Sequence, residues 1–304
     1  MSKLIAPLFS IRASGSLAET LTFRTGRKDT VATSIPTHPD ASSNAQRRHR
    51  FLYKVGIGLW NGMTPAQQAI YSAQAVGRPL TALNLWMRLW LDTAPGLTLA
   101  LPIESPPAST VHDVSPFHTH LTIYGAEWSP SPPPYSLSFD GVDDYAQVIT
   151  AMQLNFTTGP YSFMLSITNS PTPPTAHIMG RGTQSADYYF LRADSNGRLR
   201  WTVRADAGIF TTLTSPGALL PSATQTLAVT RSGSTINLYV DDLDRTTLPP
   251  STTDLDIANR SFTLGWNPAL GGTAWKGSIH WLLAFSQELT PAEVTALTSA
   301  LLNF

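Results

Sequence analysis

Residues 135–148 read YSLSFDGVDDYAQV, and the fold of the larger part of the chain is decided there. Leu137 and Phe139 alternate with serines, which is the two-residue period of a strand with one apolar face. The apolar pattern resumes at Tyr145, after an Asp-Gly pair and two further aspartates whose side chains can bond nearby backbone N–H groups. The stretch therefore predicts a strand, a tight turn and a second strand.

Short strand-like segments recur after this hairpin, with turn signals between them. A terminal helix is predicted at residue 290, where Thr290 and Glu293 form a capping box around Pro291. This order is typical of an all-β sandwich. The segments are 161–167, 177–179, 188–192, 199–203, 226–231, 235–240, 261–266 and 275–285.

Four motifs in this part of the chain resemble the concanavalin A-like lectin/glucanase domains of the laminin-G-like type. They are SFDGVDDY at 138–145, TLAVTRSGSTINLYVD at 226–241, LGW at 264–266 and WKGSIH at 275–280. The closing pattern at Ser286, Leu289, Thr290, Glu293 and Val294 also matches, whereas Asp242 stands where the family usually has glycine. The resemblance implies a mainly β fold, with a jelly-roll β-sandwich over residues 135–304.

Residues 1–93 have a different character, with 11 Lys+Arg against 4 Asp+Glu over residues 1–95. The pattern predicts a hairpin at 16–35 and three helices at about 44–59, 64–75 and 81–91. Residues 10–90 resemble a module of tailed-phage structural proteins, which implies an anchoring role in a virion. The matching residues are Pro36, Pro39, Gln46, Arg50, Phe51, Trp60, Met63, Thr64, Pro65, Thr81 and Asn84, with Tyr71 in place of a tryptophan.

Residues 94–134 are rich in proline and serine, a composition that favours extended spacing. We predict an arm that lies on a neighbouring molecule. Its histidines, His112, His118 and His120, are interpreted as surface residues of a docking strand, so no metal site is predicted there.

Two groups of residues are candidates for binding. Arg47, Arg48, Arg50 and Lys54 form a basic cluster, which we expect to contact the particle; nucleic acid is not expected, because no zinc-finger, recognition-helix or RNA-binding signature accompanies it. Trp266 and Asn267 are candidates for glycan binding, since this tryptophan lies beside a glycine-rich loop.

Catalysis is not expected. Glycosidases of this architecture need two carboxylates that flank the bond, but residues 135–304 contain only Glu288 and Glu293 as glutamates, both near the closing helix. The aspartates lie in turn contexts, where turn capping and calcium binding remain alternatives. No other cofactor is implied.

The sequence thus predicts a non-enzymatic bacteriophage virion protein, in the capsid decoration or the tail, that displays a lectin-like sandwich. Expected partners are the major capsid or tail protein and further copies of the chain in a homo-oligomer. The alternatives are an adhesin for host surface glycans and, less favoured, a glycoside hydrolase. The chain has no cysteine, and we expect neither a signal peptide nor a membrane span.

Overall fold

The computed structural model divides the chain into two compact units, residues 1–43 and residues 44–304. We describe each unit by itself. The described residues are 3–4, 15–17, 21–25, 30–34, 43–103, 109–129, 135–170, 175–183, 187–205, 209–244, 257, 260–268, 273–302 and 304.

The first unit contains a four-stranded antiparallel sheet in the order β1-β4-β3-β2. The strands are β1 (Lys3–Leu4), β2 (Gly15–Leu17), β3 (Leu21–Thr25) and β4 (Thr30–Ser34). β3 and β4 pair from Leu21↔Ser34 to Thr25↔Thr30, which confirms the hairpin expected at 16–35. The predicted motif residues Pro36 and Pro39 lie outside the described residues.

The second unit is built on two β-sheets, whose strands pair antiparallel except for a short parallel contact between β12 and β20. One sheet contains β6 (Thr110–Val111), β7 (Leu121–Tyr124), β10 (Tyr145–Val148), β12 (Ala176–Gly182), β13 (Tyr188–Ala193), β14 (Arg198–Ala205), β15 (Ile209–Ala218), β19 (Phe262–Gly265) and β20 (Thr273–Ala274). The other contains β5 (Leu97–Pro102), β8 (Glu127–Trp128), β9 (Leu137–Asp140), β11 (Tyr161–Asn169), β16 (Thr224–Ser232), β17 (Thr235–Val240), β18 (Leu243–Asp244) and β21 (Lys276–Phe285).

Among the described residues, the first sheet has nine strands in the order β15-β14-β13-β12-β19-β10-β7-β6, with β20 beside β12. The second sheet has eight described strands in the order β18-β17-β16-β11-β21-β9-β8, with β5 beside β21. The helices are α1 (Asn44–Gly62), α2 (Pro65–Ala75), α3 (Ala82–Thr93) and α4 (Pro291–Leu301), and a short 3₁₀ turn covers Met152–Leu154. The chain is therefore mainly β, and the predicted β-sandwich is confirmed.

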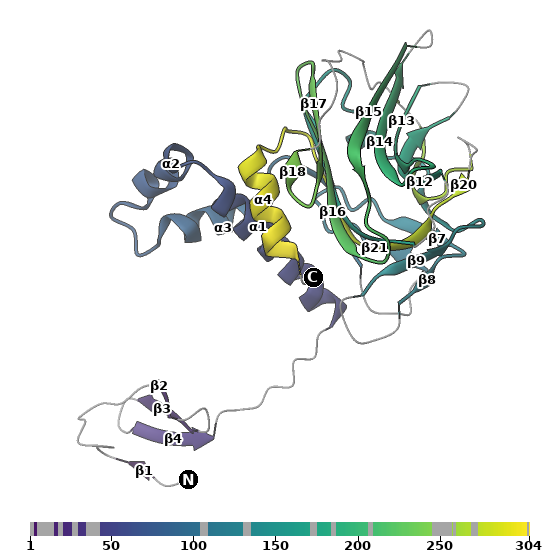
Figure 1. Cartoon of the computed structure of the whole chain (residues 1–304). Coiled ribbons are helices and arrows are strands. Elements are labelled where there is room, and N and C mark those ends of the chain that lie inside the picture. The colour runs from purple at the N-terminus through teal and green to yellow at the C-terminus, as the bar shows by residue number, and fades with distance from the viewer. Residues whose placement is uncertain are drawn as a thin grey trace. The chain divides into compact units, whose positions relative to one another are not determined.

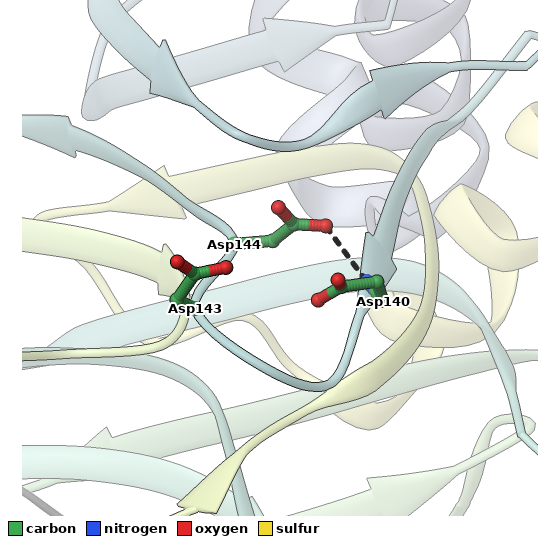
Figure 2. Close-up of side chains that lie close together, drawn as sticks. All are labelled: Asp140, Asp143 and Asp144. Atoms are coloured by element: carbon green, nitrogen blue, oxygen red, sulfur yellow. Dashed lines mark hydrogen bonds between the residues drawn. The ribbon is translucent and has the colours of Figure 1, made fainter.

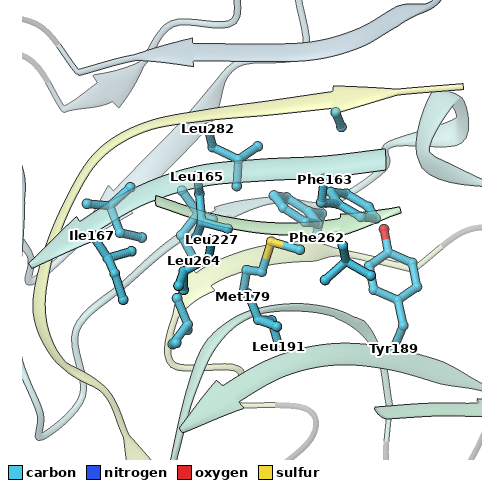
Figure 3. Packing of buried hydrophobic residues seen from close by; sticks show 14 of the residues in the cluster. Phe163, Leu165, Ile167, Met179, Tyr189, Leu191, Leu227, Phe262, Leu264 and Leu282 are labelled. Carbon is cyan, nitrogen blue, oxygen red and sulfur yellow. The ribbon is translucent and has the colours of Figure 1, made fainter. Parts of the chain in front are cut away.

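The main core lies between the two sheets (Figure 3). Phe163 and Leu165 of β11 point toward the nine-stranded sheet, where they meet residues such as Met179 and Leu191. All four are at most 1% exposed. Each such side chain contributes roughly 1.5–3 kcal/mol by its removal from water, so this layer is a major source of stability.

A second core covers the opposite face of the eight-stranded sheet, where α1 and α4 pack and α3 joins the same cluster beside α1 (Figure 1). Met164 and Leu283, which alternate with the residues of the main core, face Phe51 and Val55 of α1 together with Leu297 of α4. The eight-stranded sheet is thus buried on both faces. Only the nine-stranded sheet has an outward face that no helix of this second core covers.

Three glycines explain the close packing of α1 against its neighbours, with Gly56 facing α3 and with Gly58 and Gly62 facing α4. A Cβ at Gly56 would overlap Trp90 of α3, and a Cβ at Gly58 would lie 2.9 Å from Leu297 Cδ2. At Gly62 a Cβ would meet the backbone of Glu293 in α4. The glycines, which weaken the helix locally, therefore allow it to approach two other helices.

The structure differs from the expected organisation at residues 44–134. Residues 44–93 do not form a unit with the N-terminal hairpin, because their apolar helix faces complete the second core of the sandwich. The segment expected to be an arm, 94–134, supplies β5, β6, β7 and β8 to the two sheets. Its leucines, such as Leu99 and Leu101, are buried in the main core, which is the physical reason for this arrangement.

Among the described residues, no helix combines the length and the apolar character that a membrane crossing requires.

Candidate functional site

The outward face of the nine-stranded sheet carries an aromatic row made of Tyr124, Tyr145 and Trp266. Tyr145 of β10 pairs with Tyr124 of β7 on one side and with Gly265 of β19 on the other. The tyrosine rings stack with their centroids 4.6 Å apart and an angle of 16° between the planes. Trp266 follows directly, with its ring 6.1 Å from that of Tyr145 and nearly perpendicular to it. Such ring surfaces beside polar groups can stack on the apolar faces of sugar rings.

Gly265 fixes the position of this row. Its φ of +82° is a left-handed conformation that favours glycine. A Cβ there would overlap the Phe139 ring, so the chain can turn at this point only without a side chain. The turn directs Trp266 toward Tyr145, while the Trp266 backbone N–H donates to the carbonyl of Asp144 at 3.1 Å.

Asp140, Asp143 and Asp144 form an acidic turn (Figure 2), and Asp144 directly precedes Tyr145 of the aromatic row. One carboxylate oxygen from each residue lies within 4.8 Å of the others. Asp144 Oδ2 accepts from the Asp140 backbone N–H at 2.7 Å, and Asp140 Oδ1 accepts from Val142 N–H at the same distance. These bonds hold the turn closed, as expected for aspartates that cap a bend.

Burial raises the pKa of Asp144, and the negative charges of Asp140 and Asp143 act in the same direction, while the bond from the Asp140 backbone opposes them. Asp144 is 6% exposed, whereas the other two carboxylates lie at the surface. A calcium ion takes six to eight oxygen ligands, and two of the oxygens here already accept from backbone N–H groups. The geometry therefore fits turn capping better than a metal centre.

A second pair of aspartates, Asp241 and Asp242, also shapes a turn. Asp241 accepts from Thr226 N–H at 2.9 Å and from Gln225 Nε2 at 2.8 Å. Asp241 and Asp242 have φ values of +52° and +62°, the left-handed region that aspartate tolerates better than most residues. This accounts for aspartate at position 242, where the family pattern has glycine.

The two residues predicted to bind glycan, Trp266 and Asn267, lie in different environments. Trp266 is half-buried and belongs to the aromatic row, but Asn267 is only 1% exposed and its side chain lies inside. The structure therefore brings Trp266 together with Tyr145 and Tyr124, which the sequence interpretation did not include. The signal for both tyrosines was present, since each alternates with residues of the main core along its strand.

The predicted particle-contact residues all lie on α1. Arg47 is 9% exposed, and its guanidinium lies 4.2 Å from the centre of the Tyr135 ring and 5.8 Å from that of Phe304. Lys54 Nζ also lies over the Phe304 ring, at 5.6 Å. These two cations thus pack against aromatic rings of their own chain. Arg50 is exposed and Arg48 is half-buried.

Comparisons with known proteins agree with this architecture. Residues 140–295 match the family model described as the concanavalin A-like lectin/glucanases superfamily. No curated protein sequence shows a significant match to the chain.

Several solved structures share the fold at low identity. Domain 4 of AbnA, a GH43 extracellular arabinanase from Geobacillus stearothermophilus, is 18% identical with a TM-score of 0.53; the match covers 66% of this chain and 97% of that domain. The binding domain of botulinum neurotoxin DC is 14% identical with a TM-score of 0.54, covering 67% and 52%. A Trypanosoma rangeli sialidase is 15% identical with a TM-score of 0.51, and the match spans 93% of this chain but only 43% of the sialidase.

Proposed function

Because the chain belongs to the concanavalin A-like lectin/glucanases superfamily, we propose that it is a non-enzymatic protein that binds carbohydrate on the outward face of its nine-stranded sheet. The aromatic row carries this proposal, since stacked and perpendicular rings on a sheet face that no described helix of the second core covers are suited to sugar rings. Two structural neighbours are described in complex with arabinotriose and with SialylT. Their likeness to this chain is one of fold, and it supports a saccharide as the class of ligand.

The carboxylates of the sandwich support a binding role without hydrolysis. Glu293 accepts from the Thr290 backbone N–H at 2.8 Å and from its hydroxyl at 2.9 Å, and so caps α4. Asp194 bonds Arg198 and nearby backbone N–H groups. These acids serve the fold, whereas a glycosidase needs two carboxylates that flank a substrate.

A glycan array with the full chain, followed by calorimetry on the best ligand, tests the proposal. Trp266→Ala and Tyr145→Ala should each weaken binding by about 1–2 kcal/mol, the scale of one aromatic contact with its buried area. Tyr53→Ala is the matched control, because Tyr53 is 45% exposed and lies on α1. Absence of saccharide binding, or equal affinity in all three variants, would contradict the proposal.

We further propose that the protein is a structural component of a bacteriophage particle, in the capsid decoration or the tail, with a capsid or tail protein as its partner and a homo-oligomeric state. The resemblance of residues 10–90 to a tailed-phage module motivates this. In the structure, the motif residues Trp60 and Tyr71 contact each other with ring centroids 5.9 Å apart, and Thr64 caps α2, the helix that carries Tyr71. These motif residues therefore share one structural role, which is to hold α1 and α2 together.

Mass spectrometry and electron microscopy of purified particles test this second proposal. The chain should appear at a fixed copy number, and Arg48→Glu with Arg50→Glu should reduce its incorporation. Analytical ultracentrifugation measures the oligomeric state. If the chain is missing from purified particles, the virion proposal fails, whereas the carbohydrate proposal is unaffected.

A further inference from the structure

A polar row crosses four strands of the nine-stranded sheet, on the same outward face as the aromatic row. His177 of β12 pairs with Arg192 of β13, which pairs with Arg200 of β14, which pairs with Thr214 of β15. These side chains point outward because their strand neighbours, such as Leu191, belong to the main core. We call His177, Arg192 and Arg200 the basic row.

The basic row holds two like charges directly opposite each other. Arg192 and Arg200 are a cross-strand pair, an arrangement that is destabilising for like charges unless a counter-charge is present. Burial lowers the pKa of Arg192, and the charge of Arg200 lowers it further. Asp194 partly offsets this, but its Oδ2 accepts from Arg198 Nε at 3.0 Å and its Oδ1 accepts from two backbone N–H groups.

Buried nitrogen atoms of the basic row lack hydrogen-bond partners. They are Arg192 Nε, Arg200 Nε and His177 Nδ1, within the part of the chain that the structure describes. His177 is only 7% exposed. A buried donor without a partner costs about 1–3 kcal/mol, so such groups are rare in folded proteins unless a ligand satisfies them. The two arginine Nε atoms are always donors, so their place in one lateral row points to a ligand with acceptor oxygens.

An aromatic floor supports the basic row. The rings of Tyr188 and Phe190 stack at 5.2 Å, and His177 lies 4.7 Å from Phe190. The Arg192 guanidinium lies 5.1 Å from the Phe190 ring centre. These contacts hold the cation in place before any ligand arrives, which reduces the entropy cost of binding.

The basic row and the aromatic row lie along one line across the sheet. Met179 pairs with Leu264, so His177 of β12 and Gly265 of β19 lie just beyond this pair on neighbouring strands. Gly265 pairs with Tyr145. Three strand spacings separate Tyr145 from Arg192, which is about 14 Å at the usual distance between strands. One extended molecule can therefore contact both rows, whereas a single sugar ring cannot.

We propose that the basic row binds the anionic group, a carboxylate or a sulfate, of an acidic oligosaccharide, another ring of which stacks on the aromatic row. This inference rests on the proposed carbohydrate binding and adds the charge class of the ligand. Arginine suits this purpose because its planar guanidinium can donate two parallel hydrogen bonds to a carboxylate or sulfate.

Calorimetry with trigalacturonate and its methyl ester tests the proposal, because esterification removes the negative charges and keeps the same sugar chain. The full chain should bind the acid at least about tenfold more tightly than the ester, the scale of one charge-assisted hydrogen bond. Sodium sulfate should compete with the acid more strongly than sodium chloride at equal ionic strength.

Arg192→Gln and Arg200→Gln should each remove the preference for the acid, so that the variant binds the acid and the ester with similar affinity. Arg88→Gln on α3 is the matched control, since this exposed arginine loses the same charge and should retain the preference. The thermal midpoint of Arg192→Gln should be equal to or above that of the wild type, because the change removes a repulsion. A lower midpoint would indicate a structural role instead.

Two results separate this inference from the proposed function. Equal affinity for the acid and the ester, with both weakened by Trp266→Ala, overturns the inference and leaves carbohydrate binding intact. A preference for the acid that Arg192→Gln and Arg200→Gln both retain also overturns it. A preference that only these two variants lose supports it.

Discussion

The substitution Gly56→Ala tests the packing of α1 against α3. Alanine is favoured over glycine within a helix by about 1 kcal/mol, so propensity alone predicts a more stable protein. The structure predicts the opposite, a decrease in the free energy of unfolding. A Cβ at Gly56 would lie 2.8 Å from Trp90 Nε1 and closer still to Trp90 Cδ1.

Trp90 has little freedom to move away. It is fully buried, it stacks on Trp86 at 5.7 Å, and its Nε1 donates to the Leu52 carbonyl at 2.7 Å. Trp86 in turn donates to the carbonyl of Gly56 itself at 2.7 Å. Overpacking costs about 1–3 kcal/mol and a displaced hydrogen bond costs about 1 kcal/mol, which together exceed the gain in propensity. We expect a net loss of about 1–3 kcal/mol.

Urea unfolding of the full chain, followed by tryptophan fluorescence, measures the change in the free energy of unfolding. Gly217→Ala is the control, because Gly217 is exposed in β15 and a Cβ there meets no atom within 4 Å. The control should change stability by less than about 0.5 kcal/mol. If Gly56→Ala instead stabilises the protein by about 1 kcal/mol, the close approach of the two helices described above is wrong.

Two further predictions concern other parts of the second unit. Burial, aided by the charge of Arg192, lowers the pKa of His177 from 6.5 to about 4. As the pH falls, this histidine therefore takes up a proton in the unfolded state before it does so in the folded state. The free energy of unfolding should fall by about 3 kcal/mol as the pH falls from 6.5 to 4, and His177→Gln should flatten this part of a stability–pH curve. Thr290→Ala should lower the global free energy of unfolding by about 1 kcal/mol, because it removes the cap of α4. Thr64→Ala should fray only α2, because this helix has no buried residues. Native-state hydrogen exchange can distinguish local fraying from a global loss of stability. An unchanged slope in the first experiment, or equal effects of the two threonines, would contradict these assignments.

Local signals in the sequence predicted many of the elements well. The predicted start of the second helix, Thr64 with Pro65, coincides with the start of α2, and the capping residue Thr290 precedes α4 in the same way. Turn chemistry and period-two alternation also predicted β9, β10 and the hairpin of β16 and β17. Such signals depend on neighbouring residues, and a single sequence contains them.

Long-range packing was the part that the sequence did not reveal. Prolines and serines at 94–134 suggested an extended arm, yet β5 pairs with β21, which follows it by more than 170 residues. The serines of β11 were similarly ambiguous, since alternation usually indicates one solvated face. Ser162 is instead buried, and its hydroxyl donates to the Gln287 carbonyl and accepts from Leu289 N–H.

The candidate site was predictable only in part, for the same reason. Trp266 was identified from its local sequence, but Tyr124, Tyr145 and the three residues of the basic row come from five different strands. Each of these residues has an ordinary strand pattern when it is taken alone. Only the order of the strands across the sheet places them in one line.

The second core joins the early and late parts of the second unit, and this has a consequence for how the protein is made. Helix α1 packs on α4, and β5 pairs with β21, so residues near position 50 and position 100 complete their contacts only with residues beyond 275. A chain that emerges from the ribosome must therefore carry the part of the α1 surface that packs on α4 uncovered for most of its synthesis. Contacts so distant in sequence slow folding, because a long loop must close before they form. We expect final folding to follow translation, and truncation before β21 to leave an aggregation-prone chain.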